Sequence, residues 1–195
     1  MGVKAFQRLS EYALKRGIRC LTFYAFSTEN WRRPAAEVEA LMRLLSQYLA
    51  DLNRQQDDRN VRIRFIGERC VLNEELLRLM ESVEKRSAQN DGMQLNIAIN
   101  YGGRDEIVRA ANACLRAGEP LAESTLENYL DTAGTPPLDL IIRTGGESRL
   151  SNFLLWQGAY AELYFCPILW PDFGPAEFEK AMTWYAGRNR RFGGV

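Results

Sequence analysis

The sequence predicts an α/β protein in which a mostly parallel central sheet is flanked by helices on both faces. Strand-like segments alternate with amphipathic, helix-like segments from one end of the chain to the other. Several strand-like segments are apolar almost throughout, which is typical of parallel strands buried on both faces. The chain has 195 residues, of which 46% are hydrophobic and 26% charged, so we expect one domain over 1–195.

The first third of the chain indicates a helix, a strand and a second helix. A helix is expected over 3–16, and Gly17 ends it. Its apolar residues fall on one face: Val3, Phe6, Leu9 and Ala13. An apolar run predicts a strand over 20–26. Pro34 occupies the favoured first position of the next helix, which extends to residue 54.

The middle of the chain continues the alternation. Residues 55–60 are polar and indicate a loop. Apolar and charged residues alternate over 61–66, which predicts a strand with one solvated face. An amphipathic helix is expected over 73–88 and a strand over 93–99. The next helix follows the polar junction Asn100–Asp105, and its apolar positions are Ile107, Val108, Ala111 and Leu115.

The last third of the chain is again built from short strands and helices. A short helix is expected over 125–130, within a polar linker. Apolar runs predict strands over 138–142 and 161–165. A turn over 170–173 leads into a final helix over 175–188, and the chain ends in a basic tail.

Composition excludes several functional classes. The chain has no histidine, so a Ser–His or Cys–His nucleophile cannot form. The four cysteines are scattered without a C-x-x-C pair, which suits free thiols in a reducing cytoplasm. The formal net charge is zero, so we expect no nucleic-acid partner. No apolar run is long enough to cross a bilayer.

A polar segment with two glycines follows the strand predicted over 138–142. Arg143 ends the strand, and Gly145 and Gly146 allow a tight turn before Arg149 and Ser151. A short apolar segment begins at Asn152 and is compatible with a helix, whose N-terminal N–H groups would favour an anion. Guanidinium groups bind phosphate oxygens with two-pronged hydrogen bonds. A phosphate site is one interpretation, and a strand–turn–helix with surface arginines is the other.

The helix expected over 34–54 also has two interpretations. Its wide apolar stripe indicates either a core-facing surface or one wall of a cavity for an apolar ligand. The stripe consists of Val38, Leu41, Leu45, Tyr48, Leu49 and Leu52. With arginine-rich junctions and isolated carboxylates, the chain suits a phosphorylated substrate and a hard cation such as Mg²⁺.

Six motifs together resemble the cis-prenyltransferases, and the bacterial undecaprenyl diphosphate synthases among them most closely. Tyr24–Pro34 resembles "YAFSxENWxRP", Asn96–Gly103 resembles "NIAxNYGG", and Ile142–Gln157 resembles "IRTGGExRxSNFLLWQ". Three further stretches resemble "AYAELYF", "WPDF" and "RRFGG": Ala159–Phe165, Trp170–Phe173 and Arg190–Gly194. The resemblance covers essentially the whole chain in the family's order. Ser148 stands where many members have histidine.

The resemblance implies a reaction, a cofactor and a set of partners. Isopentenyl diphosphate would be condensed with cis geometry onto an allylic diphosphate, typically farnesyl diphosphate, and Mg²⁺ would assist the departure of pyrophosphate. The family is dimeric, so a homodimer is implied. The product is a lipid carrier, so we expect a cytoplasmic protein with a peripheral membrane contact for product release.

The resemblance also implies a role for individual residues. Asn30 would take part in removing the proton, and Glu162 would bind Mg²⁺. The substrate region would be shaped by Ser27, Thr28, Glu29, Trp31 and Arg33. The diphosphate of isopentenyl diphosphate would be bound by Arg143, Arg149 and Ser151, and Leu150 would be a further substrate-binding residue. Arg191 and Gly193 would reach from one subunit to the partner's site.

The family's pattern begins before the first motif found in this chain. Its first strand ends in "MDGNGRW" and its next helix has "RxxGHxxG", and Gly2–Lys4 corresponds to the residues just after that histidine. The missing residues would bind the allylic diphosphate. We therefore expect the domain to be N-terminally incomplete and its activity impaired. The alternative is a non-catalytic member that dimerises with a complete subunit.

Overall fold

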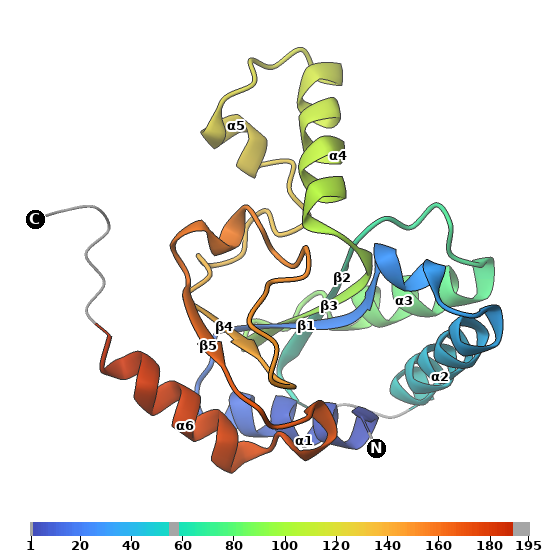
Figure 1. The fold of residues 1–195 in the computed structure, drawn as a ribbon. Coiled ribbons are helices and arrows are strands. Elements are labelled where there is room, and N and C mark those ends of the chain that lie inside the picture. Colours follow the sequence, from blue (N-terminus) through green and yellow to red (C-terminus); the bar gives the residue numbers. More distant parts are fainter. Residues whose placement is uncertain (1, 55–58, 189–195) are drawn as a thin grey trace, which may run out of the picture. The chain divides into compact units, whose positions relative to one another are not determined.

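The computed structural model describes residues 2–54 and 59–188. The chain divides into two compact units (Figure 1). The terminal unit consists of Met1–Arg16 and Pro136–Val195, and the central unit consists of Gly17–Thr135. The loop expected over 55–60 lies largely outside the described residues, and so does the basic tail beyond residue 188.

The central unit contains a three-stranded parallel sheet. Its strands are β1 (Cys20–Ser27), β2 (Val61–Ile66) and β3 (Met93–Tyr101), in the order β1-β3-β2. All residues of β3 except Gln94 are buried, because β3 has a partner on each side. Phe26 is the one residue of β1 that is buried. The expectation that the run over 20–26 is buried on both faces is therefore wrong, and β3 is the strand that fits it.

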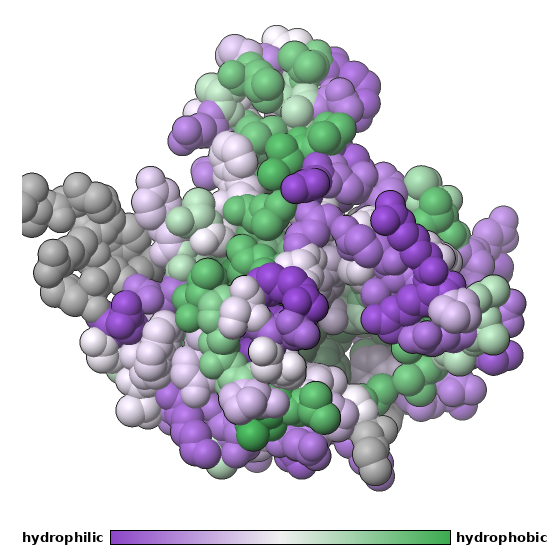
Figure 2. All heavy atoms as spheres, viewed as in Figure 1, coloured by the Kyte–Doolittle hydropathy of each residue, from purple (hydrophilic) through white to green (hydrophobic). Residues whose placement is uncertain are grey.

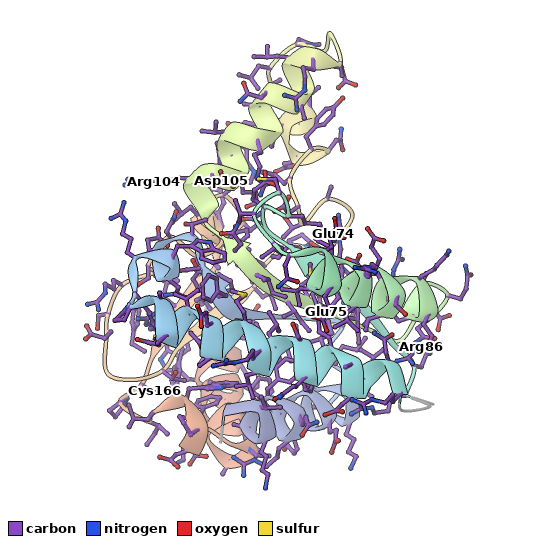
Figure 3. The ribbon with its side chains drawn as sticks, turned by 90° about the vertical axis from the view of Figure 1, so that its right-hand side faces the viewer. Glu74, Glu75, Arg86, Arg104, Asp105 and Cys166 are labelled. Carbon is purple, nitrogen blue, oxygen red and sulfur yellow. The ribbon has the colours of Figure 1, made fainter. Side chains whose placement is uncertain are left out.

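Two helices of the central unit pack against each other. α2 (Ala35–Arg54) and α3 (Glu74–Ser87) follow β1 and β2 in sequence. The Asn73 side chain caps α3 by accepting a hydrogen bond from Leu76 N at 2.8 Å. At the other end of α3, Arg86 donates to the carbonyl oxygens of Leu52 and Asn53, the latter at 2.6 Å (Figure 3). Arg86 thus satisfies carbonyl groups of the last turn of α2.

The last part of the central unit follows β3 in sequence. α4 (Gly103–Arg116) continues from the end of β3, and α5 (Glu123–Glu127) lies beside it (Figure 1). Figure 2 shows apolar surface over these two helices, and the exposed residues include Val108 and Leu115. The short helix expected over 125–130 forms two residues earlier than predicted.

A buried polar pair joins β3 to α4. Tyr101 is fully buried, and its hydroxyl donates a hydrogen bond to Glu106 Oε2. Glu106 Oε1 accepts from Asp131 N at 3.0 Å, so this carboxylate is satisfied although it is only 1% exposed. Burial, reinforced by the Glu106 carboxylate, raises the pKa of Tyr101 well above its usual range. The phenol therefore keeps its proton and remains a hydrogen-bond donor.

The terminal unit contains a second, two-stranded parallel sheet. β4 (Leu140–Arg143) pairs with β5 (Glu162–Phe165), and Leu140 lies opposite Glu162. The remaining elements are helices: α1 (Gly2–Lys15), η2 (Gln157–Tyr160), η3 (Trp170–Asp172) and α6 (Pro175–Ala186). Tyr12 and Arg16 of the first segment contact Glu179 of α6 at 3.1 and 2.9 Å.

The α/β class with parallel strands is confirmed. The five strands of the described residues lie in two sheets, and every pairing is parallel. Within residues 2–54 and 59–188, no helix combines the length and the apolar character that crossing a bilayer requires.

Candidate active site

The polar segment after β1 forms a short 3₁₀ helix, η1 (Thr28–Arg32), in the central unit. Ser27 N donates to Asn30 Oδ1 at 2.9 Å, so the Asn30 side chain caps the turn that contains it. The amide oxygen of Asn30 thus accepts a backbone hydrogen bond. Asn30 is half-buried.

Trp31 anchors the same turn to the end of β3. Its Nε1 donates to Asn100 Oδ1 at 2.7 Å. Its ring also meets the ring of Phe26 edge-on, with centroids 5.1 Å apart. Trp31 nevertheless remains 39% exposed, so one side of the indole is available for contact with a ligand.

The other predicted residues of this segment lie at or near the surface. Ser27 and Thr28 are half-buried, whereas Glu29 and Arg33 are exposed. Arg33 Nη1 forms an ion pair with Glu37 Oε1 at 2.7 Å, which ties the segment to the first turn of α2. The structure therefore brings the predicted residues 27–33 together in one turn at the carboxyl end of β1. Parallel sheets place ligands at this end of their strands.

The glycine turn after β4 is fastened to the segment after β5 in the terminal unit. Gly145 N donates to Ile168 O at 2.8 Å, and Gly146 N donates to Cys166 O at 2.9 Å. Both glycines have positive φ angles, of 87° and 77°, which side chains disfavour. Their N–H groups are used within the protein, so these two amides are not available to an anion.

The helix expected to begin at Asn152 does not form. Ser151, Asn152 and Leu154 have positive φ angles of 49°, 63° and 43°, which a right-handed helix cannot accommodate. The segment forms turns, and the helical stretch η2 starts at Gln157. Leu154 is 2% exposed, so its burial holds the segment in this strained conformation. The phosphate site cannot rely on a helix N-terminus here.

The arginines of this turn differ in their surroundings. Arg143 ends β4, and its Nε atom is buried without a hydrogen-bond partner in the described part of the chain. Arg149 is mostly exposed and forms an ion pair with Glu147. Leu150 is half-buried and Ser151 is exposed. An unpaired buried guanidinium nitrogen is unfavourable, and an anionic ligand would satisfy it.

Glu162 lies at the opposite end of the two-stranded sheet from Arg143. The register places Arg143 opposite Phe165, three residues or about 10 Å along the strands from Glu162. Glu162 Oε2 forms an ion pair with Arg188 Nε at 3.1 Å. Arg188 also lies over the ring of Trp184, 5.1 Å from its centroid. Arg188 belongs to no motif and is 26 residues from Glu162 in the chain, so sequence reasoning did not identify this contact.

Glu162 is the predicted metal ligand, and its chemistry fits Mg²⁺. Mg²⁺ takes oxygen ligands and commonly combines one or two carboxylates with substrate phosphates and water. Among residues 2–54 and 59–188, no group of three or more acidic, cysteine or histidine side chains is placed to hold a metal ion. Substrate phosphates would therefore have to complete the coordination. The predicted residues Arg191 and Gly193 lie outside the described residues.

Comparison with known proteins matches the whole chain. The family described as putative undecaprenyl diphosphate synthase matches residues 1–193. An isoprenyl transferase of Rhodopirellula baltica is 45% identical over 201 residues, which cover 100% of this chain and 82% of that protein. A (2E,6E)-farnesyl-diphosphate-specific ditrans,polycis-undecaprenyl-diphosphate synthase of Buchnera aphidicola is 42% identical, over 100% of this chain and 81% of that protein. The crystal structure of a probable undecaprenyl diphosphate synthase from Campylobacter jejuni superposes with a TM-score of 0.89 at 39% identity. It covers 98% of this chain and 91% of that chain.

Proposed function

The chain belongs to the undecaprenyl diphosphate synthase family of cis-prenyltransferases, and from this premise we propose that it condenses isopentenyl diphosphate with farnesyl diphosphate. A carbon–carbon bond would form with cis geometry, pyrophosphate would leave the allylic carbon with the bonding pair, and a proton would be lost. Repeated condensation would give a long polyprenyl diphosphate such as undecaprenyl diphosphate. We propose that residues 1–195 belong to a single cis-prenyltransferase domain, which the match over residues 1–193 supports.

The observation that supports a diphosphate site most directly is the buried Nε of Arg143. This group lies at the end of β4, on the same chain segment as Arg149 and Ser151. Two guanidinium groups and a hydroxyl suit the diphosphate of isopentenyl diphosphate, with Leu150 between them. Because the glycine N–H groups of the turn are already used, these side chains would supply the contacts.

Glu162 would hold Mg²⁺ together with substrate phosphates. The bound ion would neutralise charge that develops on the departing pyrophosphate. In the structure Arg188 neutralises Glu162, so the guanidinium has to be displaced when Glu162 binds a cation. The Glu162 carboxylate would thus be neutralised in both states, by Arg188 before the metal binds and by the metal ion afterwards.

Asn30 would take part in proton removal, and α2 would line the channel for the apolar product chain. Because Asn30 Oδ1 already accepts from Ser27 N, Asn30 would take part in proton removal by donating a hydrogen bond from Nδ2 that orients the reacting groups, and the pyrophosphate that leaves would accept the proton. The apolar stripe of α2 is only partly buried: Leu41, Leu45 and Tyr48 are half-buried. A dry channel for an apolar chain needs such residues, which supports the cavity interpretation of this stripe.

A homodimer is the quaternary structure that we propose. Exposed apolar side chains extend from the end of η2 through β5 to the segment after it: Tyr160, Leu163, Phe165, Ile168 and Leu169. Large exposed apolar patches mark interaction surfaces. Arg191 and Gly193 would reach from one subunit to the partner's site. A soluble, cytoplasmic dimer would release its lipid product through a peripheral membrane contact.

The dimer is tested by the molar mass of the chain in solution. The wild type is expected to have twice the mass of one chain at micromolar concentration. Leu163→Glu places a charge in the patch and is expected to shift the protein to the monomer. Val108→Glu, an equally drastic change on exposed α4, is the control and should leave the mass unchanged. A monomeric wild type would contradict the proposal.

The reaction is tested by isoprenyl transfer. The chain is incubated with farnesyl diphosphate, labelled isopentenyl diphosphate and Mg²⁺, and labelled polyprenyl diphosphate is expected. A chelator should abolish the product, and Glu162→Gln should lower kcat/KM by about 100-fold or more. Glu179→Gln breaks another arginine ion pair of the terminal unit and should leave transfer unchanged. Bound isopentenyl diphosphate without any product would favour the non-catalytic dimerisation partner instead.

A further inference from the structure

Asn100 joins three strand ends of the central unit through one side chain. It lies near the end of β3, is 4% exposed and has a φ of 50°. Its Oδ1 accepts from Trp31 Nε1 at 2.7 Å, and its Nδ2 donates to Glu68 O at 2.8 Å. Its own carbonyl oxygen accepts from Glu68 N at 3.1 Å. Both ends of the amide are thus used, one towards η1 after β1 and the other towards the loop after β2.

The loop after β2 is a rigid anchor for Asn100. Gly67 approaches β3 so closely that a Cβ there would lie 2.1 Å from Ile99 O. Gly67 N donates to Asp131 Oδ2 at 2.8 Å, and Arg109 binds both oxygens of Asp131, at 2.9 and 2.7 Å. Such two-pronged pairs fix geometry as well as charge.

The same loop holds Glu68 as an anion. Cys70 N donates to Glu68 Oε1 at 2.9 Å, and this hydrogen bond, with Arg109 nearby, lowers the pKa of the Glu68 carboxyl. Glu68 Oε2 lies 3.7 Å from Arg109 Nε. The backbone of Gly67 and of Glu68, which is hydrogen-bonded to Asn100, is therefore fixed by several contacts. These contacts also fix the position of Asn100.

The turn that bears Asn30 depends on side-chain anchors at both ends. η1 has five residues, and isolated 3₁₀ turns are held by poorly aligned hydrogen bonds. The Ser27–Asn30 bond fixes its beginning, and the Trp31–Asn100 bond fixes the residue next to Asn30. Trp31 otherwise has the edge-on contact with Phe26 and is 39% exposed.

We propose that Asn100 is a positioning residue for the condensation, acting through Trp31 to fix η1 and the Asn30 amide that it bears. This inference rests on the proposed function, because it assigns the positioned amide a part in proton removal. The left-handed backbone alone does not explain asparagine here, since glycine adopts that conformation more easily. What asparagine adds is one acceptor and one donor directed at two different loops.

The test compares Asn100→Gly, Trp31→Phe and the double variant in isoprenyl transfer. Asn100→Gly keeps the backbone conformation accessible but removes both side-chain hydrogen bonds. Trp31→Phe keeps an aromatic ring and removes the indole donor. Each single variant should lower kcat about 10- to 100-fold, because a misplacement of about 1 Å has effects of this size. KM for isopentenyl diphosphate should change less than threefold.

The double variant distinguishes positioning from independent damage. Both single changes break the same Trp31–Asn100 bond, so the loss in the double variant should be close to that of the worse single variant. Asn100→Asp keeps the acceptor for Trp31 and should retain more kcat than Asn100→Gly. Asn73→Ala removes the cap of α3 and controls for lost stability: it should lower Tm but leave kcat unchanged. Full kcat in Asn100→Gly, or losses that multiply in the double variant, would overturn the proposal.

Trp31 emission provides a readout that does not require turnover. The Trp31 contribution is the difference between wild-type and Trp31→Phe spectra, taken again in the Asn100→Gly background. Asn100→Gly should shift this emission to longer wavelength and increase quenching by iodide, because the indole is released. Unchanged emission would overturn the proposed contact. If the wild type shows no transfer, the proposed function fails and the positioning role with it, whereas the emission result still decides the contact.

Discussion

Arg143→Ala is expected to lower kcat/KM for isopentenyl diphosphate about 100- to 1000-fold, because each hydrogen bond from a charged group to phosphate is worth roughly 1.5–3 kcal/mol. Most of the loss should appear in KM if Arg143 binds the diphosphate equally in the ground and transition states. Arg143→Lys keeps the charge but loses Nε and the planar fork, so we expect it to recover only part of the activity.

The stability of Arg143→Ala separates a binding role from a structural one. Arg143 Nε is buried and makes no hydrogen bond among the residues described. Alanine removes this unsatisfied group, so the free energy of unfolding should stay constant or rise. Steady-state kinetics and urea unfolding on the same preparations measure both effects. Arg78→Ala on α3, which removes a 75% exposed side chain, is the control for loss of a surface charge. A large loss of stability with unchanged KM would contradict the assignment.

Gly67→Ala is expected to destabilise the protein by roughly 4 kcal/mol, the sum of a strained backbone and a steric clash. Gly67 has a φ of 116°, and an added Cβ would lie 2.1 Å from Ile99 O. The neighbouring atoms are backbone atoms of β3, which cannot move without disturbing the pairing of β2 with β3. Urea unfolding followed by far-UV circular dichroism measures the change.

Gly17→Ala is the matched control for Gly67→Ala. Gly17 also has a positive φ, of 79°, but no atom lies within 4 Å of the position of its Cβ. Only the left-handed conformation is penalised there, by roughly 1–2 kcal/mol. If both variants lose the same stability, the close approach of Gly67 to β3 contributes nothing and its place in the anchor of Asn100 is wrong.

The regular elements could be predicted because their signals are local. The strand over 61–66 has the predicted bounds, since alternating apolar and charged residues define one buried face. Asn73 lies one residue before α3 and caps it, as a helix start signal should. The division into two sheets and the low burial of β1 depend on which strands become neighbours, and no local pattern specifies that.

The positive φ angles of Ser151, Asn152 and Leu154 show why part of the candidate site could not be predicted. Serine and leucine rarely adopt positive φ angles, so their types indicate nothing unusual. The conformation follows from long-range contacts, such as the hydrogen bond from Gly145 N to Ile168 O and the burial of Leu154.

A motif in the sequence is enough to nominate a candidate site residue, whereas a residue defined only by its three-dimensional contacts cannot be nominated from the sequence. Arg143 and Glu162 belong to motifs and lie at the two ends of one small sheet. Arg188 carries no motif and contacts Glu162 across 26 residues. Asn100 belongs to the polar junction Asn100–Asp105. Its hydrogen bond to Trp31 joins residues 69 positions apart, so the sequence could not predict this bond.

The amides of Gly145 and Gly146 donate hydrogen bonds within the protein, and this has an evolutionary consequence. Where backbone amides bind a phosphate, the contacts do not depend on side-chain identity. Point mutations then have little effect on the affinity for the phosphate. Here the amides of Gly145 and Gly146 hold the loop, and under the proposed function side chains would contact the diphosphate. Single codon changes at such positions alter affinity without rebuilding the loop. Under the proposed function, such substitutions would change the affinity for isopentenyl diphosphate in small heritable steps.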